Sequence, residues 1–148
     1  MMNNDNSITV ETALYGYIAE EAHSSRFCAI VNKLFKGNNV NAMIIPMNIR
    51  PDDVTFTISQ MRSSKLNGAV ISMEYQEEAF GLLDNASVLV QKSGYCDFIR
   101  IVDGKLMGEL IMPMALEKFA QSEDFMDDIA LNSMTRYFYE LTTGEYNE

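Results

Sequence analysis

Apolar positions in the first three quarters of the chain fall into short strand-like runs separated by stretches with helical spacing. Runs of bulky apolar residues predict strands at 12–18, 42–47 and 69–73. The stretches between them predict helices, because apolar residues recur there every three or four positions. We expect these helices from Ser24 or Ser25 to Gly37, from Pro51 to Met61, and over 77–83.

Two further strands are expected over 95–102 and 105–111. Asp103 and Gly104 separate them, and Asp-Gly is a favoured two-residue hairpin turn. Three strand–helix units followed by a hairpin predict an α/β fold. We expect a three-layer α/β/α arrangement whose sheet is mostly parallel, with an antiparallel hairpin at one side.

The last part of the chain has helical spacing throughout. Ser122 is a good helix cap followed by two acidic residues, and Gly144 is a plausible helix end. An apolar stripe runs through Phe125, Ile129, Met134, Tyr137 and Leu141. The 148 residues therefore predict a single domain, with an α/β core at 12–113 and an acidic helical extension at 114–148.

The net charge is −10, and it is unevenly placed along the chain. Residues 1–108 hold 12 acidic and 9 basic residues, whereas residues 109–148 hold 9 acidic and only 2 basic residues. Such a surface repels phosphate backbones, so we expect no direct nucleic-acid binding, and it favours a basic protein partner. The polar N-terminus and the lack of a long apolar run indicate a cytoplasmic protein without membrane contact.

The residues that usually carry metal or nucleophilic chemistry are sparse. The two cysteines, Cys28 and Cys96, have no metal-ligand spacing and are expected to be buried thiols. His23 is the single histidine, which excludes sites that need several histidines. We expect no metal site and interpret His23 as a solvated loop residue.

Four segments between Tyr15 and Pro113 together resemble the substrate-binding domain of shikimate dehydrogenases. They are the segment 15–18, Ser25 with Asn32 and Phe35, the segment 68–76, and the segment 103–108. The resemblance implies the fold of that domain. In the family this domain continues into a nicotinamide-binding Rossmann domain, whereas this sequence contains no Gly-x-Gly-x-x-Gly motif.

The resemblance also implies that the proton-transfer residues of the family have been replaced. The family motif Asn-Val-Thr-x-Pro-x-Lys matches residues 70–76, so that the lysine corresponds to Gln76. The aspartate of the later motif Gly-x-Asn-Thr-Asp corresponds to Met112. We therefore expect no catalytic residue and no cofactor.

The substrate-contacting positions of the family are only partly kept. Ser25 matches the first of two carboxylate-binding serines, while Phe27 occupies the second position. Apolar Val70 and Leu110 stand where the family has asparagines, and removing such polar partners disfavours a hydroxylated acid. The remnant of the pocket is expected to comprise Ser25, Asn32, Ser72, Gln76 and Asp97.

Three functions fit these features. The first is a non-catalytic acidic protein that neutralises a basic partner, such as the immunity protein of a bacterial nuclease toxin. The others are the substrate-binding half of a dehydrogenase and a ligand-sensing domain. The acidic residues expected at a protein interface are Glu117, Glu123, Asp124, Asp127 and Asp128. The alternative is that this segment is an ordinary amphipathic helix with a solubilising outer face.

Overall fold

The computed structural model of the chain describes residues 11–119 and 129–144. The chain divides into two compact units. The sheet unit comprises Ala13–Ser25 and Ile44–Leu110, and the helical unit comprises the described parts of Met1–Thr12, Arg26–Met43 and Ile111–Glu148. The expected organisation as one domain with a core and an extension stays a prediction.

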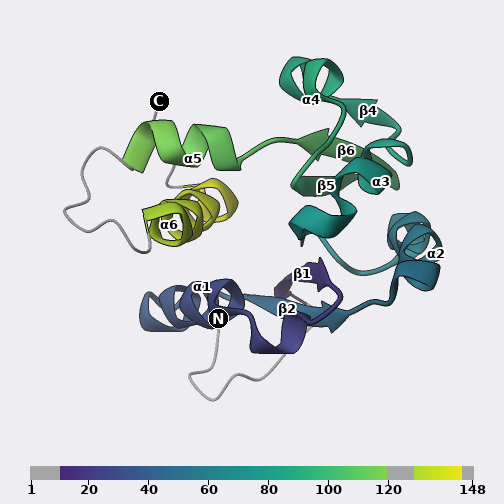
Figure 1. Cartoon of the computed structure of the whole chain (residues 1–148). Helices are drawn as coiled ribbons and strands as arrows, with labels where there is room; N and C mark the ends of the chain where they lie inside the picture. The colour runs from purple at the N-terminus through teal and green to yellow at the C-terminus, as the bar shows by residue number, and fades with distance from the viewer. Residues whose placement is uncertain (1–10, 120–128, 145–148) are drawn as a thin grey trace. The chain divides into compact units, whose positions relative to one another are not determined.

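The sheet has six strands in the order β2-β1-β3-β5-β6-β4 (Figure 1). Their bounds are β1 Ala13–Ala19, β2 Ala42–Asn48, β3 Gly68–Ile71, β4 Asn85–Ala86, β5 Phe98–Val102 and β6 Lys105–Glu109. β1 is parallel to β3, and β4 is parallel to β6. β5 is antiparallel to both of its neighbours, β3 and β6. The sheet is therefore mixed, and the expected α/β class is confirmed.

The β5–β6 hairpin has the predicted turn. Asp103 and Gly104 both have positive φ, 53° and 74°, as a type I′ turn requires, and Val102 pairs with Lys105 across it. The flanking strands are shorter than expected, however. β5 begins at Phe98 rather than at residue 95, because the Cys96 N–H donates to the Gln76 carbonyl (3.3 Å) instead of to a strand. β6 ends at Glu109, and helix α5 begins at Met112.

Three short α-helices belong to the sheet unit: α2 Val54–Gln60, α3 Gln76–Phe80 and α4 Val88–Ser93. The predicted helix start at Pro51 is a 3-10 turn, Pro51–Asp53, that leads into α2. The helix expected over 77–83 ends early, because Leu82 N–H bonds to Ala79 O in a tighter turn. No helix or strand was expected at the positions of β4 and α4.

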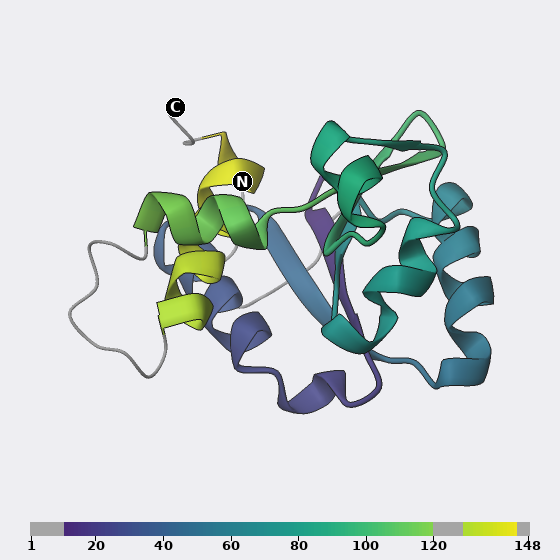
Figure 2. The ribbon, with the colours of Figure 1, turned by 45° about the horizontal axis from the view of Figure 1, so that its top comes forward.

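The core of the sheet unit lies where α2 and α3 pack on the strands, and Figure 2 shows these two helices side by side. The predicted stripe of α2 is confirmed, since Val54 and Ile58 are fully buried. They belong to one buried cluster with alternate residues of the strands, including Ile18, Ile71 and Ile99. This packing fixes the strands whose ends carry the candidate site.

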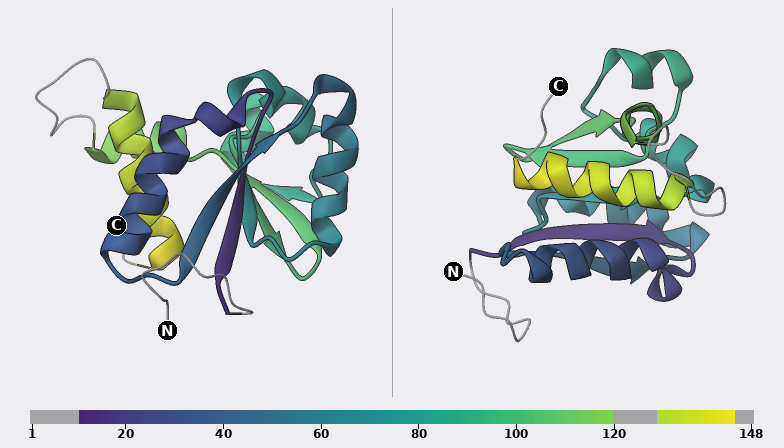
Figure 3. Two further views of the ribbon diagram at one scale, coloured as in Figure 1. Left: turned by 90° about the horizontal axis from the view of Figure 1, so that it is seen from below. Right: turned by 90° about the vertical axis from the view of Figure 1, so that its left-hand side faces the viewer.

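The helical unit contains α1 Arg26–Gly37, α5 Met112–Phe119 and α6 Ile129–Thr143. α6 packs against α1, and Figure 3 shows the two helices beside each other. The Phe27 and Phe138 rings meet edge to face, 5.6 Å between centroids, and Lys118 of α5 bonds to Glu140 of α6 at 3.0 Å. The predicted helical C-terminal part is confirmed for these residues, and Gly144 has φ 80° at the helix end. The expected cap Ser122 and the stripe residue Phe125 lie outside the described residues.

Candidate functional site

One edge of the sheet gathers the ends of several strands. β1 and β3 are parallel, so their carboxyl ends meet there, and Ile49 N–H donates to Ala19 O (2.9 Å), which brings in the end of β2. The antiparallel β5 starts at the same edge, where Ile71 N–H donates to Asp97 O (2.8 Å). We call the segments 20–25, 49–53, 72–78 and 94–97 the carboxyl edge. Ligands of open α/β sheets bind outside the carboxyl ends of strands.

Four of the five residues expected in the pocket remnant belong to the carboxyl edge. These are Ser25, Ser72, Gln76 and Asp97. The fifth, Asn32, lies on α1 of the helical unit, where it is half-buried. Backbone hydrogen bonds place Ser72 beside the end of β1 and Asp97 beside the end of β3, because Ser72 N–H donates to Ile18 O and Ile71 N–H donates to Asp97 O.

The hydroxyl of Ser72 donates to the carboxylate of Glu74, an exposed residue of the same edge. Its Oγ lies 2.6 Å from Glu74 Oε1, while the backbone N–H of Glu20 donates to Glu74 Oε2 at 3.0 Å. Desolvation acts to raise the pKa of Glu74, but the hydrogen bonds from Ser72 and Glu20 outweigh it and the pKa lies below its ordinary value. Glu74 is therefore a fixed negative charge at neutral pH.

Gln76 is held by the end of β3. Its Nε2 donates to the Ile71 carbonyl at 2.9 Å, five residues back in the chain. An amide exchanges no proton near neutral pH, so Gln76 can donate and accept hydrogen bonds but cannot act as a general acid or base.

Asp97 is a buried acid at the start of β5. Its side chain and backbone together are only 3% exposed, and its N–H donates to Glu109 O at 3.2 Å. Burial, and then the charge of Asp97, raises the pKa of the neighbouring Cys96 thiol to about 12. Cys96 is therefore not a thiolate nucleophile at neutral pH, in agreement with the expectation of a buried thiol, which Cys28 also meets.

The loop that carries Ser25 is fastened by Asn48. The Oδ1 of Asn48 accepts from the His23 N–H at 2.9 Å, and its Nδ2 lies 3.0 Å from His23 Nδ1. Because the amide nitrogen is a donor, this geometry makes Nδ1 the acceptor and assigns the ring proton to Nε2. His23 is exposed and holds the loop in place.

Sequence reasoning missed Glu20, Asn48 and Glu74 as residues that shape this edge. The contacts of Glu20 with Glu74 and of His23 with Asn48 span 54 and 25 positions, which no local pattern reveals. A signal did exist for Glu74, since it stands where the family motif quoted above has its proline.

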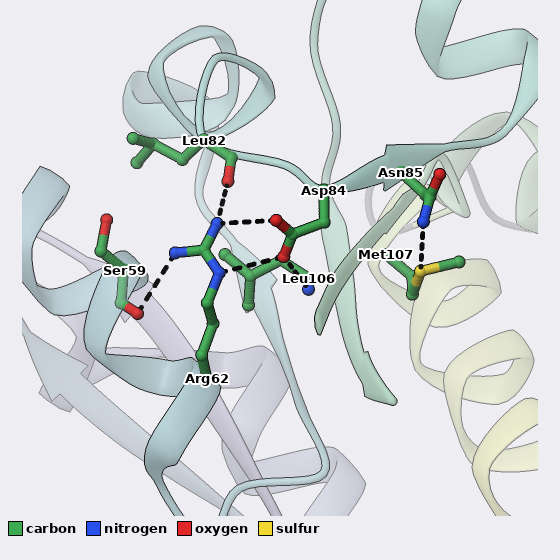
Figure 4. A network of polar contacts seen from close by, with 7 residues as sticks. All are labelled: Ser59, Arg62, Leu82, Asp84, Asn85, Leu106 and Met107. Carbon is green, nitrogen blue, oxygen red and sulfur yellow. Dashed lines mark hydrogen bonds and ion pairs between the residues drawn. The ribbon is translucent and has the colours of Figure 1, made fainter. Parts of the chain in front are cut away.

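The opposite edge of the same sheet has a different polar network, which Figure 4 shows from close by. Arg62 donates to both oxygens of Asp84 (3.0 and 3.3 Å) and to Leu82 O (2.8 Å), and Asp84 Oδ2 also accepts from Leu106 N–H (2.8 Å). Arg62 and Asp84 are thus paired with each other. The network therefore joins the amino ends of β4 and β6 to the turn after α2.

Two further expectations concern metals and partner proteins. Within residues 11–119 and 129–144, no group of three or more His, Cys, Asp and Glu side chains could hold a metal ion. Glu117 is exposed on α5, whereas Glu123, Asp124, Asp127 and Asp128 lie outside the described residues. The protein interface, and with it the toxin-inhibitor function, stays a prediction. In the part of the chain that the structure covers, no helix is long and apolar enough to cross a membrane.

Comparison with known proteins identifies the family of the chain. The family model described as "Shikimate dehydrogenase substrate binding domain" matches residues 17–99, which include the end of β1, all of β3 and all four segments of the carboxyl edge. The chain belongs to this family. The resemblance inferred from the four sequence segments is thus confirmed for the shikimate dehydrogenase substrate-binding domain.

Individual relatives show the same relationship. A shikimate dehydrogenase (NADP(+)) of Pyrococcus furiosus is 30% identical over 118 residues, which cover 77% of this chain and 43% of that protein. A crystal structure of a shikimate dehydrogenase in complex with NADP+ has a TM-score of 0.72 at 19% identity and covers 86% of this chain and 48% of the other. The enzyme of Aquifex aeolicus has a TM-score of 0.71 at 19% identity, with coverages of 88% and 54%.

The structural matches confirm the fold, and the sequence matches confirm the family. The chain spans less than half the length of the curated relatives that it matches. The ligands and reactions of the full-length enzymes are therefore properties of those enzymes and are not assigned to this chain by the comparison.

Proposed function

We propose that this chain is a non-catalytic binding domain that holds a small hydroxylated molecule at the carboxyl edge of its sheet. The proposal is supported by family membership and by the positions of Ser72 and Asp97 at the ends of the parallel strands β1 and β3, with Ser25 in the loop that follows β1. These groups offer hydroxyl and carboxylate oxygens, which suit a ligand with several hydroxyls.

The hydrogen bond from Gln76 Nε2 to Ile71 O carries the non-catalytic part of the proposal. In the motif of the family this position is the proton-shuttling lysine, and the residue here does not titrate. The nearby Cys96 thiol is held protonated, and Glu74 is held ionised by Ser72 and Glu20. None of these groups has a pKa near neutral pH, where a general acid or base works best.

The proposal is tested by two measurements on the full chain. Chemical-shift mapping with scyllo-inositol, shikimate and scyllo-inosamine (neutral, anionic and cationic ring compounds) should place any bound ring at residues 20–25, 72–78 and 94–97. Incubation with shikimate and NADP+ should give no turnover, whereas an ordinary enzymatic rate of about 1 per second or more would contradict the non-catalytic assignment.

The matched control is Lys105→Gln, which changes an exposed charge of the β5–β6 hairpin at the opposite edge. It should leave the mapped shifts unchanged. If none of the three ring compounds perturbs the carboxyl edge at millimolar concentration, the binding function proposed for this edge is wrong.

A further inference from the structure

The backbone hydrogen-bond ladder between β1 and β3 stops one donor short of the carboxyl edge. Ser72 N–H donates to Ile18 O at 2.9 Å, at the end of both strands. Alternate residues of a strand face the same neighbouring strand, so the next donor of β1 on this side is the N–H of Glu20. The Ser72 carbonyl would continue the ladder, but it accepts from Tyr75 N–H (2.9 Å), because the chain turns there into a 3-10 helix. The N–H of Glu20 therefore needs an acceptor from a side chain.

The carboxylate of Glu74 supplies that acceptor. Its Oε2 accepts from Glu20 N–H at 3.0 Å, and its Oε1 accepts from the Ser72 hydroxyl at 2.6 Å. Desolvation acts against the charged form, but these hydrogen bonds outweigh it and lower the pKa of Glu74. Both oxygens are engaged, which orients the side chain although the residue is exposed. A side-chain oxygen thus extends the ladder beyond the end of β3.

This contact holds the start of the loop that carries Ser25. The loop leaves β1 at Glu20 and reaches Ser25 through a 3-10 turn. Asn48 fastens the middle of the loop, because its Oδ1 accepts from the His23 N–H at 2.9 Å. Glu74 fastens the first residue of the loop, so the two contacts together orient it on the sheet.

The residues that follow Glu74 bond to the other segments of the edge. Tyr75 Oη donates to Ile49 O at 2.6 Å, directly after β2. Gln76 O accepts from Cys96 N–H at 3.3 Å, ahead of β5. Three consecutive residues of the turn after β3 thus each bond to a different segment. This turn therefore connects the four segments of the carboxyl edge.

Resting on the proposed function, we infer that Glu74 is a positioning residue, whose carboxylate latches the loop 20–25 to the turn after β3 and so presents Ser25 and Ser72 as one preformed surface. Preformed surfaces bind with a smaller ordering cost. Such a latch needs a side-chain acceptor, and the proline that the family motif has at this position offers none. The latch is therefore a property of this chain and not of the motif.

Amide hydrogen exchange of the full chain tests the latch without any ligand. Exchange rates distinguish a loop that opens alone from a protein that unfolds as a whole. In Glu74→Ala the Glu20 N–H loses its charged acceptor. The amides of residues 20–25 should therefore exchange about tenfold faster, the factor expected for the loss of one hydrogen bond to a charged group. The amides of α2 and β3 should keep their rates.

Two further variants show whether the acceptor itself is responsible. Glu74→Gln keeps one side-chain oxygen that can accept from Glu20 N–H, so it should retain most of the protection that Glu74→Ala loses. Glu77→Ala is the matched control, because it removes an exposed carboxylate of the same edge from α3. It should leave exchange in the loop unchanged.

Chemical-shift mapping connects the latch to binding. Scyllo-inositol, shikimate and scyllo-inosamine are added to Glu74→Ala and to Glu77→Ala. A ring compound that perturbs the carboxyl edge of the unmodified chain should still perturb residues 94–97 of Glu74→Ala, but its effect on residues 20–25 should fall several-fold. Glu77→Ala should respond as the unmodified chain does.

The outcomes separate the latch from the function on which it rests. The latch is overturned if Glu74→Ala exchanges no faster at 20–25 than Glu77→Ala, if Glu74→Gln loses as much protection as Glu74→Ala, or if the whole sheet unit exchanges faster to the same degree. The positioning role is overturned if a ring compound perturbs residues 20–25 equally in Glu74→Ala and the unmodified chain. If the exchange contrast is present and no ring compound perturbs the edge, the latch stands and the binding function is overturned.

Discussion

The two edges of the sheet unit use charge in opposite ways. The opposite edge, formed by segments 61–68, 82–85 and 102–106, holds three basic and two acidic residues. Arg62 and Asp84 neutralise each other there and also bind the backbone of Leu82 and Leu106. The carboxyl edge holds eight acidic residues and one arginine. The same fold therefore carries one balanced edge and one with a large excess of negative charge.

This difference separates structure from function within one small unit. A balanced network stabilises the junction of β4, β6 and the turn after α2, and it leaves little for a ligand to satisfy. Uncompensated charge costs stability through repulsion, and proteins break local rules of this kind mainly at functional sites. We therefore expect changes at the opposite edge to affect folding and changes at the carboxyl edge to affect binding.

The largest effect on folding is expected at Gly68, the first residue of β3 on the opposite-edge side. A Cβ on Gly68 would lie 2.6 Å from Ile99 O and 3.2 Å from the Phe98 ring, and a backbone oxygen in a sheet cannot easily move. Gly68→Ala should lower the free energy of unfolding by about 1–3 kcal/mol, measured by chemical denaturation.

Gly81→Ala is the control for this substitution in the same unit. A Cβ there would meet only Glu78 O at 3.5 Å, an ordinary contact, and the φ of Gly81 is −68°. It should be neutral or slightly stabilising. Equal destabilisation by the two alanines would contradict the close packing of β3 on β5.

The sequence was sufficient for features that depend on neighbouring residues. The Asp103–Gly104 turn and the buried stripe of α2 follow from local chemistry, and both are present. α4 was missed although Ser87 caps it and Gly94 ends it, because Val88 and Leu89 are exposed and give no amphipathic pattern. The sequence also did not show whether β5 runs parallel or antiparallel to β3, because the alternation of side chains along a strand is the same in both kinds of pair.

The candidate site was predictable only where it follows the family motif. Ser25, Ser72, Gln76 and Asp97 were assigned because their positions match motif residues, and their role as a site stays a prediction. Glu74 was not assigned a role, because its importance comes from the N–H of Glu20, which the fold brings to it. Long-range contacts of this kind require the strand order.

A smaller effect on folding is expected when the balanced network loses its cation. The hydrogen bond from Arg62, followed by that from Leu106 N–H, lowers the pKa of Asp84. A lowered pKa in the folded state gives stability that is present at neutral pH and is lost as the pH falls through that pKa. Arg62→Gln should therefore destabilise the protein more at pH 7 than at an acidic pH below the pKa of Asp84 in both proteins.

Denaturation curves at the two pH values measure this difference, with Lys65→Gln as the control. Lys65 is an exposed base of the same segment, so it tests whether charge alone matters. A loss for Arg62→Gln that is independent of pH would show that the arginine acts only through its bond to Leu82 O.

The smallest effect is expected from relieving the excess charge of the carboxyl edge. Glu77 is exposed on α3 among the acidic residues of this edge, so Glu77→Gln should leave the free energy of unfolding unchanged or raise it by up to about 0.5 kcal/mol. Added sodium chloride screens repulsion between exposed charges and should stabilise the unmodified chain more than this variant. Asp103→Asn provides the comparison, because the opposite edge has no excess of acids and the salt response should not change there. Melting curves across a salt series measure both effects. If Glu77→Gln lowers stability and salt does not stabilise the chain, the acids of the carboxyl edge are compensated in the folded protein. The contrast between the two edges would then be wrong.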